Sequence, residues 1–202
     1  MKNAVEVFNK FGTGDLCNAH PEVRALGAAI KPLYPGIKLI GPAKTARMSP
    51  GQNAAIHLAV HTSQPGDVLV VDGGGTRGFG PFGDILATGC QKKQIAGLVI
   101  DSTIRDAGAL REMQFPVFCL GSNPTGTVKT EVPEVDIEIL CGDAPVKPGD
   151  LIFGDDDGVV VIPQALAAEV AEKAAAVQAR EKGFLERLAA GETTYEIFKL
   201  GG

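Results

Sequence analysis

The sequence predicts a single mixed α/β domain with a partly parallel sheet and a long helix towards its carboxyl end. Between residues 68 and 120, apolar runs alternate with helical patterns, a rhythm typical of parallel strands joined by crossover helices. Beyond Gly121, short strand-forming runs alternate with turns, and an Ala-rich stretch then predicts the long helix. No linker interrupts the 202 residues, so we expect one domain over residues 1–202, with a helical extension from about residue 163.

In the first half of the chain, turn residues separate the expected elements. Thr13 is expected to cap a short helix through Leu16 and Ala19, after an opening helical pattern around Val5 and Phe8. Strands are expected at residues 38–48, 68–71 and 97–100, and helices at residues 52–61 and 85–94.

In the second half, a turn and short helix at residues 102–113 should lead into a strand at residues 117–120. Pro163 occupies a natural first-turn position of the long helix. The sequence Pro-Gly-Asp precedes a buried strand twice, and we interpret it as one turn device used twice because the flanks differ. The remaining strands are expected at residues 127–131, 135–140, 150–153 and 159–162, and the helices at residues 163–189 and 193–200.

Charge and cysteine content exclude several classes of protein. The formal net charge of −5 and the lack of a basic stripe argue against a nucleic-acid partner. The opening residues form no apolar signal core and no stretch is long enough to span a bilayer, so we expect no membrane association and a cytoplasmic location. The cysteines are scattered, which predicts reduced thiols and neither a zinc site nor a disulfide framework; they are Cys17, Cys90, Cys119 and Cys141.

A glycine-rich loop, residues 73–80, follows the expected strand that ends near Asp72. It lacks the Lys-Ser or Lys-Thr of a phosphate-binding P-loop, and it is too long and broken for a dinucleotide fingerprint. An S-adenosylmethionine loop, and thus a methyltransferase, is the nearest competing interpretation, although the chain is small for that fold.

Two other motifs have simpler interpretations. His57 and His61 share a helix face, but Leu58 stands where a metalloprotease has its Glu, so we interpret both as ordinary histidines. Residues 155–158, Asp-Asp-Asp-Gly, lack the ligand spacing of an EF-hand and are expected to form a turn between strands.

The strongest candidate site combines two loops. Residues 101–106, Asp-Ser-Thr-Ile-Arg-Asp, follow an apolar strand and place a guanidinium beside carboxylates, where loops of α/β sheets commonly build sites. Gly83 and Asp84 begin a helix whose free N–H groups attract an anion. A carboxylate held there, with Arg105 opposite and a metal on Asp106, would make a complete site for an oxo acid.

Three motifs of the chain, in their order and spacing, resemble the RraA-like family, and the similarity covers residues 41–163 and the following helix. The motifs are Val-Val-Asp-Gly-Gly-Gly, Gly-Asp-Ile-Leu-Ala and Gly-Leu-Val-Ile-Asp-Ser-Thr-Ile-Arg-Asp. The resemblance implies an RraA-like fold with a swivelling β/β/α-type core. The family includes 4-hydroxy-4-methyl-2-oxoglutarate aldolases with oxaloacetate decarboxylase activity, and regulators of ribonuclease activity; its members have often been labelled as menaquinone methyltransferases. The family motif commonly has Gly where this chain has Ser102, which is tolerated if the turn needs no positive φ.

The resemblance also implies roles for individual residues. Asp106 resembles the metal-coordinating Asp, for Mg²⁺, Mn²⁺ or another divalent cation, and Arg105 resembles the catalytic, substrate-binding Arg. Asp84 resembles a catalytic residue that holds water near the metal. The backbone amides that resemble the pyruvate-carboxylate cradle are those of Gly83, Asp84, Ile85 and Leu86.

Glu181 is similar in position to a catalytic acid that reaches the site of a neighbouring subunit. Glu172 and Glu186 are alternatives on the same helix. No obvious path returns Glu181 to Asp106 in one chain, so we expect a homo-oligomer, a trimer or a pair of trimers, with sites at subunit interfaces.

The chemistry expected from these residues is that of a lyase acting on a small oxo acid. Cleavage of a 4-hydroxy-2-oxo acid, or decarboxylation of oxaloacetate, leaves a pyruvate enolate that a divalent cation stabilises as a Lewis acid. Arg105 would add positive charge at the oxyanion, an effect of about 3 kcal/mol or more per donor. No Lys in the motif region predicts a Schiff base, since Lys92 and Lys93 lie on a polar helix face. The alternative is a non-catalytic regulator of ribonuclease activity, because the fold is common to both.

Overall fold

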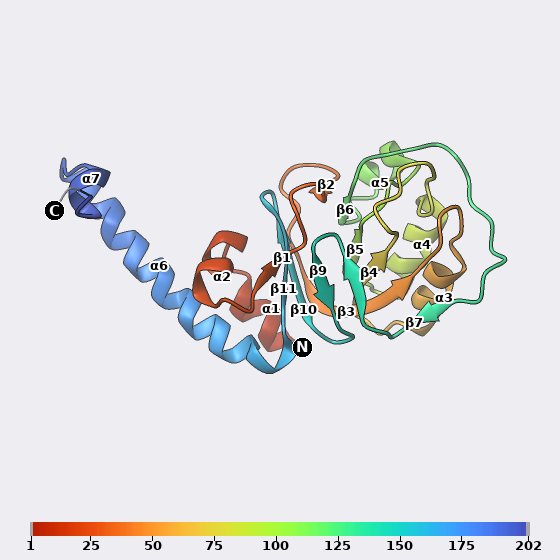
Figure 1. The fold of residues 1–202 in the computed structure, drawn as a ribbon, viewed down its shortest axis with the longest axis horizontal. Helices are drawn as coiled ribbons and strands as arrows, with labels where there is room; N and C mark the ends of the chain where they lie inside the picture. The colour runs from red at the N-terminus through yellow and green to blue at the C-terminus, as the bar shows by residue number, and fades with distance from the viewer. Residues whose placement is uncertain (1, 201–202) are drawn as a thin grey trace.

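The computed structural model describes residues 2–200 and confirms a mixed α/β fold with a curled sheet and a long carboxyl-terminal helix (Figure 1). Residues 1, 201 and 202, which the expected domain included, lie outside the described part. The helices are α1 (Lys2–Phe8), α2 (Thr13–Ala19), α3 (Ala54–Thr62), α4 (Asp84–Lys92), α5 (Ala107–Glu112), the 3-10 turn Gln164–Leu166, α6 (Ala167–Ala189) and α7 (Thr194–Ile197). The strands are β1 (Arg24–Ala25), β2 (Lys31–Pro32), β3 (Leu39–Arg47), β4 (Val68–Asp72), β5 (Gly97–Ile100), β6 (Val117–Cys119), β7 (Glu134–Val135), β8 (Ile139–Cys141), β9 (Ala144–Val146), β10 (Leu151–Asp155) and β11 (Gly158–Ile162).

The long strand β3 joins the two parts of the sheet. Its first half pairs antiparallel with β10, with Leu39 opposite Gly154, and its second half pairs parallel with β4, with Ala43 opposite Val68. The strands β4, β5 and β6 continue the parallel part, as the alternating pattern predicts. Since β4 and β5 run side by side in the same direction, the loops that follow them leave the sheet at the same edge.

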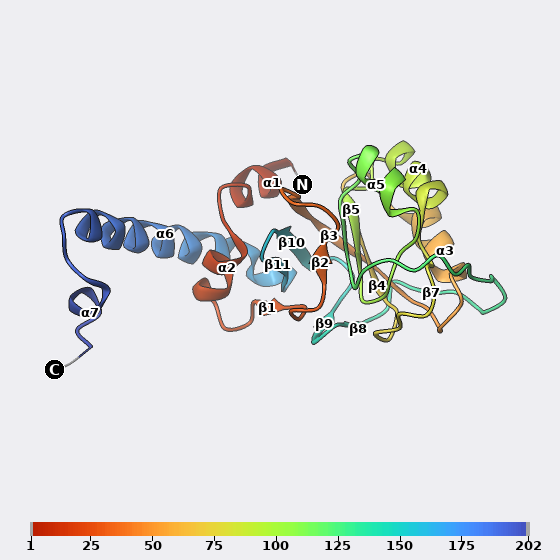
Figure 2. The same cartoon turned by 90° about the horizontal axis from the view of Figure 1, so that it is seen from above.

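Helices cover the two parts of the sheet separately. The helices α3, α4 and α5 lie over the parallel strands, and their buried side chains include Ile56, Leu86 and Leu110 (Figures 1 and 2). At the other end of the molecule, Phe11 of the turn before α2 and Val170 of α6 belong to the core beside β10 and β11. The parallel part therefore has a hydrophobic core of its own, and it carries both candidate loops.

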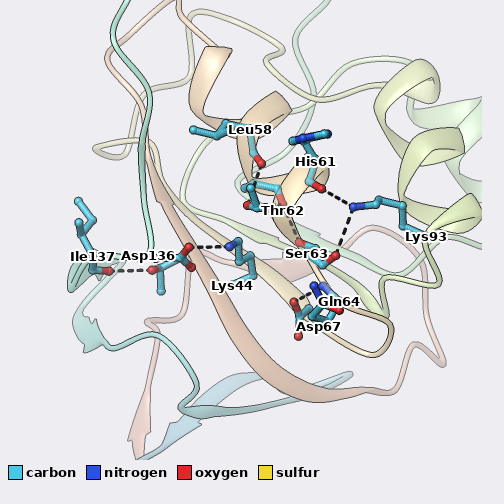
Figure 3. A network of polar contacts seen from close by, with 12 residues as sticks. Lys44, Leu58, His61, Thr62, Ser63, Gln64, Asp67, Lys93, Asp136 and Ile137 are labelled. Atoms are coloured by element: carbon cyan, nitrogen blue, oxygen red, sulfur yellow. Dashed lines mark hydrogen bonds and ion pairs between the residues drawn. The ribbon is translucent and has the colours of Figure 1, made fainter.

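The two Pro-Gly-Asp sequences form the same type of turn, as the sequence predicts. Gly66 and Gly149 both have a left-handed backbone, with φ of 90° and 86°. In each turn the Asp side chain accepts a hydrogen bond from the backbone three residues earlier, from Gln64 to Asp67 at 2.7 Å and from Lys147 to Asp150 at 2.9 Å. Figure 3 shows the first of these turns beside the end of α3.

The lysines of this region hold structural positions. Lys93 donates from its Nζ to the carbonyl oxygens of His61 and Ser63, which ties α4 to the end of α3 (Figure 3). The sequence analysis missed Lys44, which is buried in β3 and pairs with Asp136 at 2.6 Å. Both ammonium groups are bound by oxygen atoms, so neither is a free amine for a Schiff base.

One expected strand was wrong because its residues bond elsewhere. Residues 127–131 form no strand: they run beside the turn before α3, with Val128 donating to Gly51 and accepting from Asn53. The expected turn and short helix at residues 102–113 are confirmed: residues 102–106 form a loop that bonds to the glycine-rich segment, and α5 begins at Ala107.

Two further expectations need correction. Thr13 is the first residue of α2 and not its cap; the carboxylate of Asp155 accepts from both the backbone N and Oγ1 of Thr13, each at 2.8 Å. Residues 135–140 are not one strand but parts of β7 and β8, with Asp136 in a left-handed turn between them. The Asp-rich residues 155–158 do form a turn between strands, β10 and β11.

The helix α6 extends beyond the rest of the chain, and Figures 1 and 2 agree on this. Its first half is anchored by the buried residues Val170, Ala174 and Val177, whereas Leu185 and Leu188 in its second half are exposed. None of the helices within residues 2–200 is both long enough and apolar enough to cross a membrane.

Candidate functional site

The two loops predicted to form the site do meet, at the carboxyl edge of β4 and β5. The backbone N–H of Arg105 donates to the Phe82 carbonyl at 2.8 Å, and the N–H of Asp84 faces Asp106 Oδ2 at 3.4 Å. Side chains tie the loops further: the Ser102 hydroxyl donates to the Thr76 carbonyl at 2.8 Å, and Thr103 donates to the Phe79 carbonyl. Ser102 does not have a positive φ, so serine at this position is unstrained.

Two glycines permit this close approach. A Cβ on Gly80 would collide with the Asn123 carbonyl oxygen and lie 2.7 Å from Arg105 Cβ. A Cβ on Gly83 would collide with Asp106 Oδ2 and lie 3.0 Å from Arg105 Cγ. Gly80 is therefore required because backbone atoms pack directly against it, and Gly83 leaves room for the side chains of Arg105 and Asp106 in their present positions.

Asp106 has an unusual backbone for a non-glycine residue. It is the N-cap of α5 in a left-handed conformation, with φ of 55° and ψ of 34°, which Asp and Asn tolerate better than other residues. Its side chain makes no capping hydrogen bond to its own helix. Instead, Oδ2 lies 3.3 Å from Arg105 Nε, and the carboxylate is directed at the start of α4.

The amide cradle at the start of α4 already binds carboxylate oxygens of the protein. The N–H of Ile85 donates to Asp84 Oδ1 at 2.7 Å, and the N–H of Asp84 faces Asp106. Helix N-termini attract negative charge in this way. A substrate carboxylate that binds the same amides would displace these side-chain oxygens.

The donor set of the site fits a hard divalent cation. Within residues 2–200 no cluster of three or more His, Cys, Asp or Glu side chains is arranged to hold a metal. Asp106 and Asp84 nevertheless bring two carboxylates to one helix terminus, and Mg²⁺ commonly binds one or two carboxylates together with substrate oxygens and water. Asp106, with a side chain that is 37% exposed, is accessible to such an ion.

Asp101 has a role that the sequence analysis did not assign. Its carboxylate accepts hydrogen bonds from the backbone N–H groups of Gly73 and Gly142, and thereby fixes the glycine-rich loop. Burial raises the pKa of Asp101, the two backbone hydrogen bonds partly offset this, and the charge of Asp72 raises it further. The glycine-rich segment is thus positioned by a buried acid.

We predict that Asp101→Asn destabilises the fold. The amide must direct its NH₂ group at one of the two backbone N–H groups, which loses a buried hydrogen bond and costs about 1–3 kcal/mol of unfolding free energy. Urea unfolding followed by circular dichroism measures this loss. Because the folded-state pKa is raised, the wild-type contribution is full below the unfolded pKa and falls as pH rises through the folded pKa. The stability of the wild type should therefore fall as pH rises through this range, whereas that of Asp101→Asn should not. A variant as stable as the wild type would contradict the role of the two hydrogen bonds.

A pocket of about 270 Å³ opens beside the two loops. Its lining includes Gly83, Leu86 and Arg105, and also residues outside the two predicted loops. These further lining residues are Asn53, His57, Thr127 and Lys129. The spacing of His57 and His61 hinted at a helix face but not at its location: His57 lines the pocket, whereas His61 is exposed.

Among the predicted site residues within residues 2–200, Glu181 is the one that lies far from the start of α4. It lies on the projecting part of α6, and Figures 1 and 2 show α6 and α4 at opposite ends of the molecule. Residues 170, 174 and 177 face the body of the chain, and residue 181 continues the same helix face beyond that contact. Phe184 and Leu188 follow on this face.

Comparisons with known proteins agree with this architecture. Residues 13–161 match a family model described as RraA-like, Aldolase/RraA. A protein of Halalkalibacterium halodurans named "Putative 4-hydroxy-4-methyl-2-oxoglutarate aldolase" is 36% identical over 175 residues, which cover 87% of this chain and 83% of that protein.

Two solved structures are also similar. Streptomyces coelicolor RraAS2, titled an unusual member of the RNase ES inhibitor RraA family, has a TM-score of 0.82 and 30% identity over 92% of this chain and 98% of its own. A Geobacillus kaustophilus protein titled as an S-adenosylmethionine: 2-dimethylmenaquinone methyltransferase has a TM-score of 0.71 and 31% identity over 78% of this chain and 98% of its own.

Proposed function

The chain belongs to the RraA-like family, and we propose that it is a divalent-metal-dependent lyase. It would cleave 4-hydroxy-2-oxo acids such as 4-hydroxy-4-methyl-2-oxoglutarate to pyruvate, and decarboxylate oxaloacetate. The observation that carries the proposal is the meeting of Arg105, Asp106 and the start of α4, beside a pocket that Arg105 and Gly83 line.

Each of these groups has a task in the proposed reaction. The amides at the start of α4 would bind the carboxylate of the pyruvate unit, assisted by the helix dipole. Asp106 would hold a divalent cation, with Asp84 beside it, and the bound cation would supply Lewis-acid stabilisation of the enolate. Asp84 can also orient a water molecule that takes the proton from the 4-hydroxyl group, since its carboxylate lies at the same helix terminus.

Arg105 would stabilise the negative charge that develops on the 2-oxo oxygen. Its guanidinium is fixed by Asp106 at 3.3 Å and is 40% exposed, so part of its donor set is free for a ligand. A preorganised donor of this kind acts at the developing charge without reorganisation during the reaction.

A homo-oligomer, a trimer or a pair of trimers, would complete the site. Within one chain Glu181 lies on the far arm, on a helix face that carries Phe184 and Leu188. An acid flanked by apolar side chains on such an arm is suited to a contact with another copy. We propose that Glu181 reaches the pocket of the neighbouring subunit.

The fold alone does not separate this function from that of a ribonuclease regulator, because RraAS2 shares it. A regulator would need a protein-binding surface, but it would not need an accessible carboxylate and a guanidinium at a small pocket. The methyltransferase title of the Geobacillus protein has no support from the glycine-rich loop, which Asp101 fixes in place.

The decisive experiment measures pyruvate release coupled to lactate dehydrogenase. The panel contains 4-hydroxy-4-methyl-2-oxoglutarate, other 4-hydroxy-2-oxo acids and oxaloacetate, each with and without Mg²⁺ or Mn²⁺. We expect turnover that requires the cation. No pyruvate from any of these acids, with cation present and the protein folded, would leave the regulator as the better candidate.

We predict that Arg105→Lys folds normally but loses turnover by about 100-fold, because Lys cannot reproduce the planar donor fork of Arg. The measurement is kcat/KM for pyruvate release, with circular dichroism as the control for folding. Arg111→Lys is a matched control, since Arg111 lies on α5 outside the pocket lining. A near-normal kcat/KM for Arg105→Lys would reduce Arg105 to a structural partner of Asp106.

A further inference from the structure

Three hydrogen bonds join the loop of residues 101–106 to the glycine-rich segment that leads into α4. Each is donated by the first loop to a carbonyl oxygen of the second, and the accepting carbonyls are three residues apart. The bonds run from the Ser102 hydroxyl to Thr76 at 2.8 Å, from the Thr103 hydroxyl to Phe79, and from the Arg105 backbone N–H to Phe82 at 2.8 Å. The two loops are therefore joined along their length and not only where they meet at α4.

The two hydroxyl groups are buried, so water competes little for their hydrogen bonds. Ser102 is 0% exposed and Thr103 is 4% exposed. The carbonyls that they bind lie between β4 and α4, outside any helix or strand that could supply another donor. A carbonyl that loses its donor must move to find a new one. Removal of either hydroxyl is therefore expected to loosen the contact between the two loops.

A separate set of bonds holds the loop of residues 101–106 from its other side. The backbone N–H of Ile104 donates to the Gly121 carbonyl at 3.0 Å, and its carbonyl accepts from the Asn123 N–H at 2.8 Å. The Ile104 side chain is buried in the core. These bonds should keep the loop folded without the two hydroxyls, but they attach it to the segment after β6 and not to the segment before α4.

The position of the Arg105 guanidinium depends on this arrangement. Among residues 2–200 its side chain has one ion pair, at 3.3 Å to the adjacent Asp106, which belongs to the same loop. The side chain also lies close to the backbone of Gly83, because a Cβ added there would be 3.0 Å from Arg105 Cγ. The placement of the guanidinium relative to α4 is therefore set by how the two loops are joined.

We infer that Ser102 and Thr103 are positioning residues, which act on the reaction through Arg105. The inference rests on the proposed lyase function. The hydroxyl groups do not touch the substrate; they hold the loop of Arg105 at a fixed distance from the amides at the start of α4. Glycine, which is common at position 102 in the family motif, has no hydroxyl and could not make the bond to Thr76.

A positioning role through Arg105 should affect kcat and not KM. In the proposed reaction Arg105 stabilises charge that develops on the 2-oxo oxygen, so its interaction is strongest in the transition state. The amides at the start of α4 bind the substrate carboxylate equally in the ground state and the transition state. Displacement of the guanidinium alone therefore lowers kcat and kcat/KM together and leaves KM nearly unchanged.

The first test removes one hydroxyl and then restores it. Thr103→Val keeps the branched shape of the side chain but has no hydroxyl, and kcat for pyruvate release is expected to fall about tenfold. Thr103→Ser restores a hydroxyl and should recover most of kcat. Ser102→Ala should lower kcat in the same way, and a rise in KM with kcat unchanged in these variants would contradict the positioning role.

The second test asks whether Thr103 acts through Arg105. Two residues that contribute through one interaction have non-additive effects. In an Arg105→Lys background, Thr103→Val should therefore lower kcat by no more than about twofold. A further tenfold loss in that background would mean that Thr103 acts on another group, and the inference would be wrong.

Matched controls remove buried hydroxyls that bind carbonyls elsewhere. Thr45 of β3 donates to the Ile137 carbonyl, and Ser63 at the end of α3 donates to the Ala59 carbonyl, each at 2.7 Å (Figure 3 shows Ser63). Thr45→Val and Ser63→Ala should lower the Tm of the protein as Thr103→Val and Ser102→Ala do, but they should leave kcat unchanged. Equal losses of kcat in the controls would show a general loss of stability and not a positioning role.

Hydrogen exchange without substrate separates this inference from the proposed function. Mass spectrometry should show faster amide exchange in residues 76–82 and 102–106 of Thr103→Val than in the wild type or in Thr45→Val. If even the wild type releases no pyruvate, the lyase proposal fails, while faster exchange still supports the placement of Arg105 and unchanged exchange overturns it. If the wild type releases pyruvate and Thr103→Val has the same kcat, the lyase stands and the positioning role is wrong.

Discussion

Asp106→Asn is expected to reduce pyruvate release below detection while the protein stays folded. Asn has nearly the volume of Asp and also tolerates the left-handed backbone of this position, with φ of 55°. It lacks the negative charge that would hold a divalent cation. The loss should therefore come from the site and not from the fold, and it is measured in the coupled assay and by thermal unfolding.

The choice of substitution matters because Asp106 combines two roles. Asp106→Ala removes the carboxylate but also adds roughly 1–2 kcal/mol of backbone strain, since Ala disfavours this conformation. Asp106→Gly removes the carboxylate and relieves the backbone. If the metal role is right, all three variants are inactive although their unfolding free energies differ, and chelation by EDTA inactivates the wild type reversibly. Full activity of the wild type in excess EDTA would rule out the metal-dependent mechanism.

The core of the site could be predicted because its parts are local in sequence. Gly83 lies immediately before α4, and Arg105 and Asp106 lie in the loop after β5; the apolar pattern identifies both elements, and parallel strands bring their following loops to one edge. The close approach of Gly83 to the Arg-Asp pair follows from that edge and needs no distant segment.

The part of the pocket lining that contains His57 and Lys129 could not be predicted in the same way. Lys129 follows His57 by 72 positions, and its segment was expected to be a strand. In the structure that segment bonds to the turn before α3, where the edge of β3 is already paired with β7. The apolar Val128 remains 56% exposed, so burial gave no pattern from which its position could be read.

Backbone conformation and long-range hydrogen bonds could not be predicted from the sequence either. The left-handed backbone of Asp106 at the start of α5 is not marked by any pattern in the sequence. The carboxylate of Asp101 bonds to Gly73 and Gly142, which lie on either side of it in sequence and far from each other. Neither feature has a sequence period, because each depends on how separate loops pack.

The second large effect concerns Glu181. Glu181→Ala is expected to lose nearly all turnover while retaining its fold and its oligomeric state, because the residues that anchor α6 are Val170, Ala174 and Val177. Glu172→Ala and Glu186→Ala are matched controls on the same helix and should stay active. If Glu186→Ala is inactive and Glu181→Ala is active, the neighbouring acid holds the role instead.

Mixing two inactive variants tests whether the site is shared between subunits. Asp106→Ala subunits retain Glu181, and Glu181→Ala subunits retain Asp106, so a mixed interface can contain one intact copy of each. With equal amounts and random exchange in a cyclic oligomer, about one quarter of the interfaces are complete, and roughly that fraction of wild-type activity should return. Exchange is verified by mass spectrometry of subunits with different tags, and assembly by analytical ultracentrifugation. No recovery despite proven exchange, or a fully active wild-type monomer, would mean that each chain completes its own site and that α6 extends from the body for another reason.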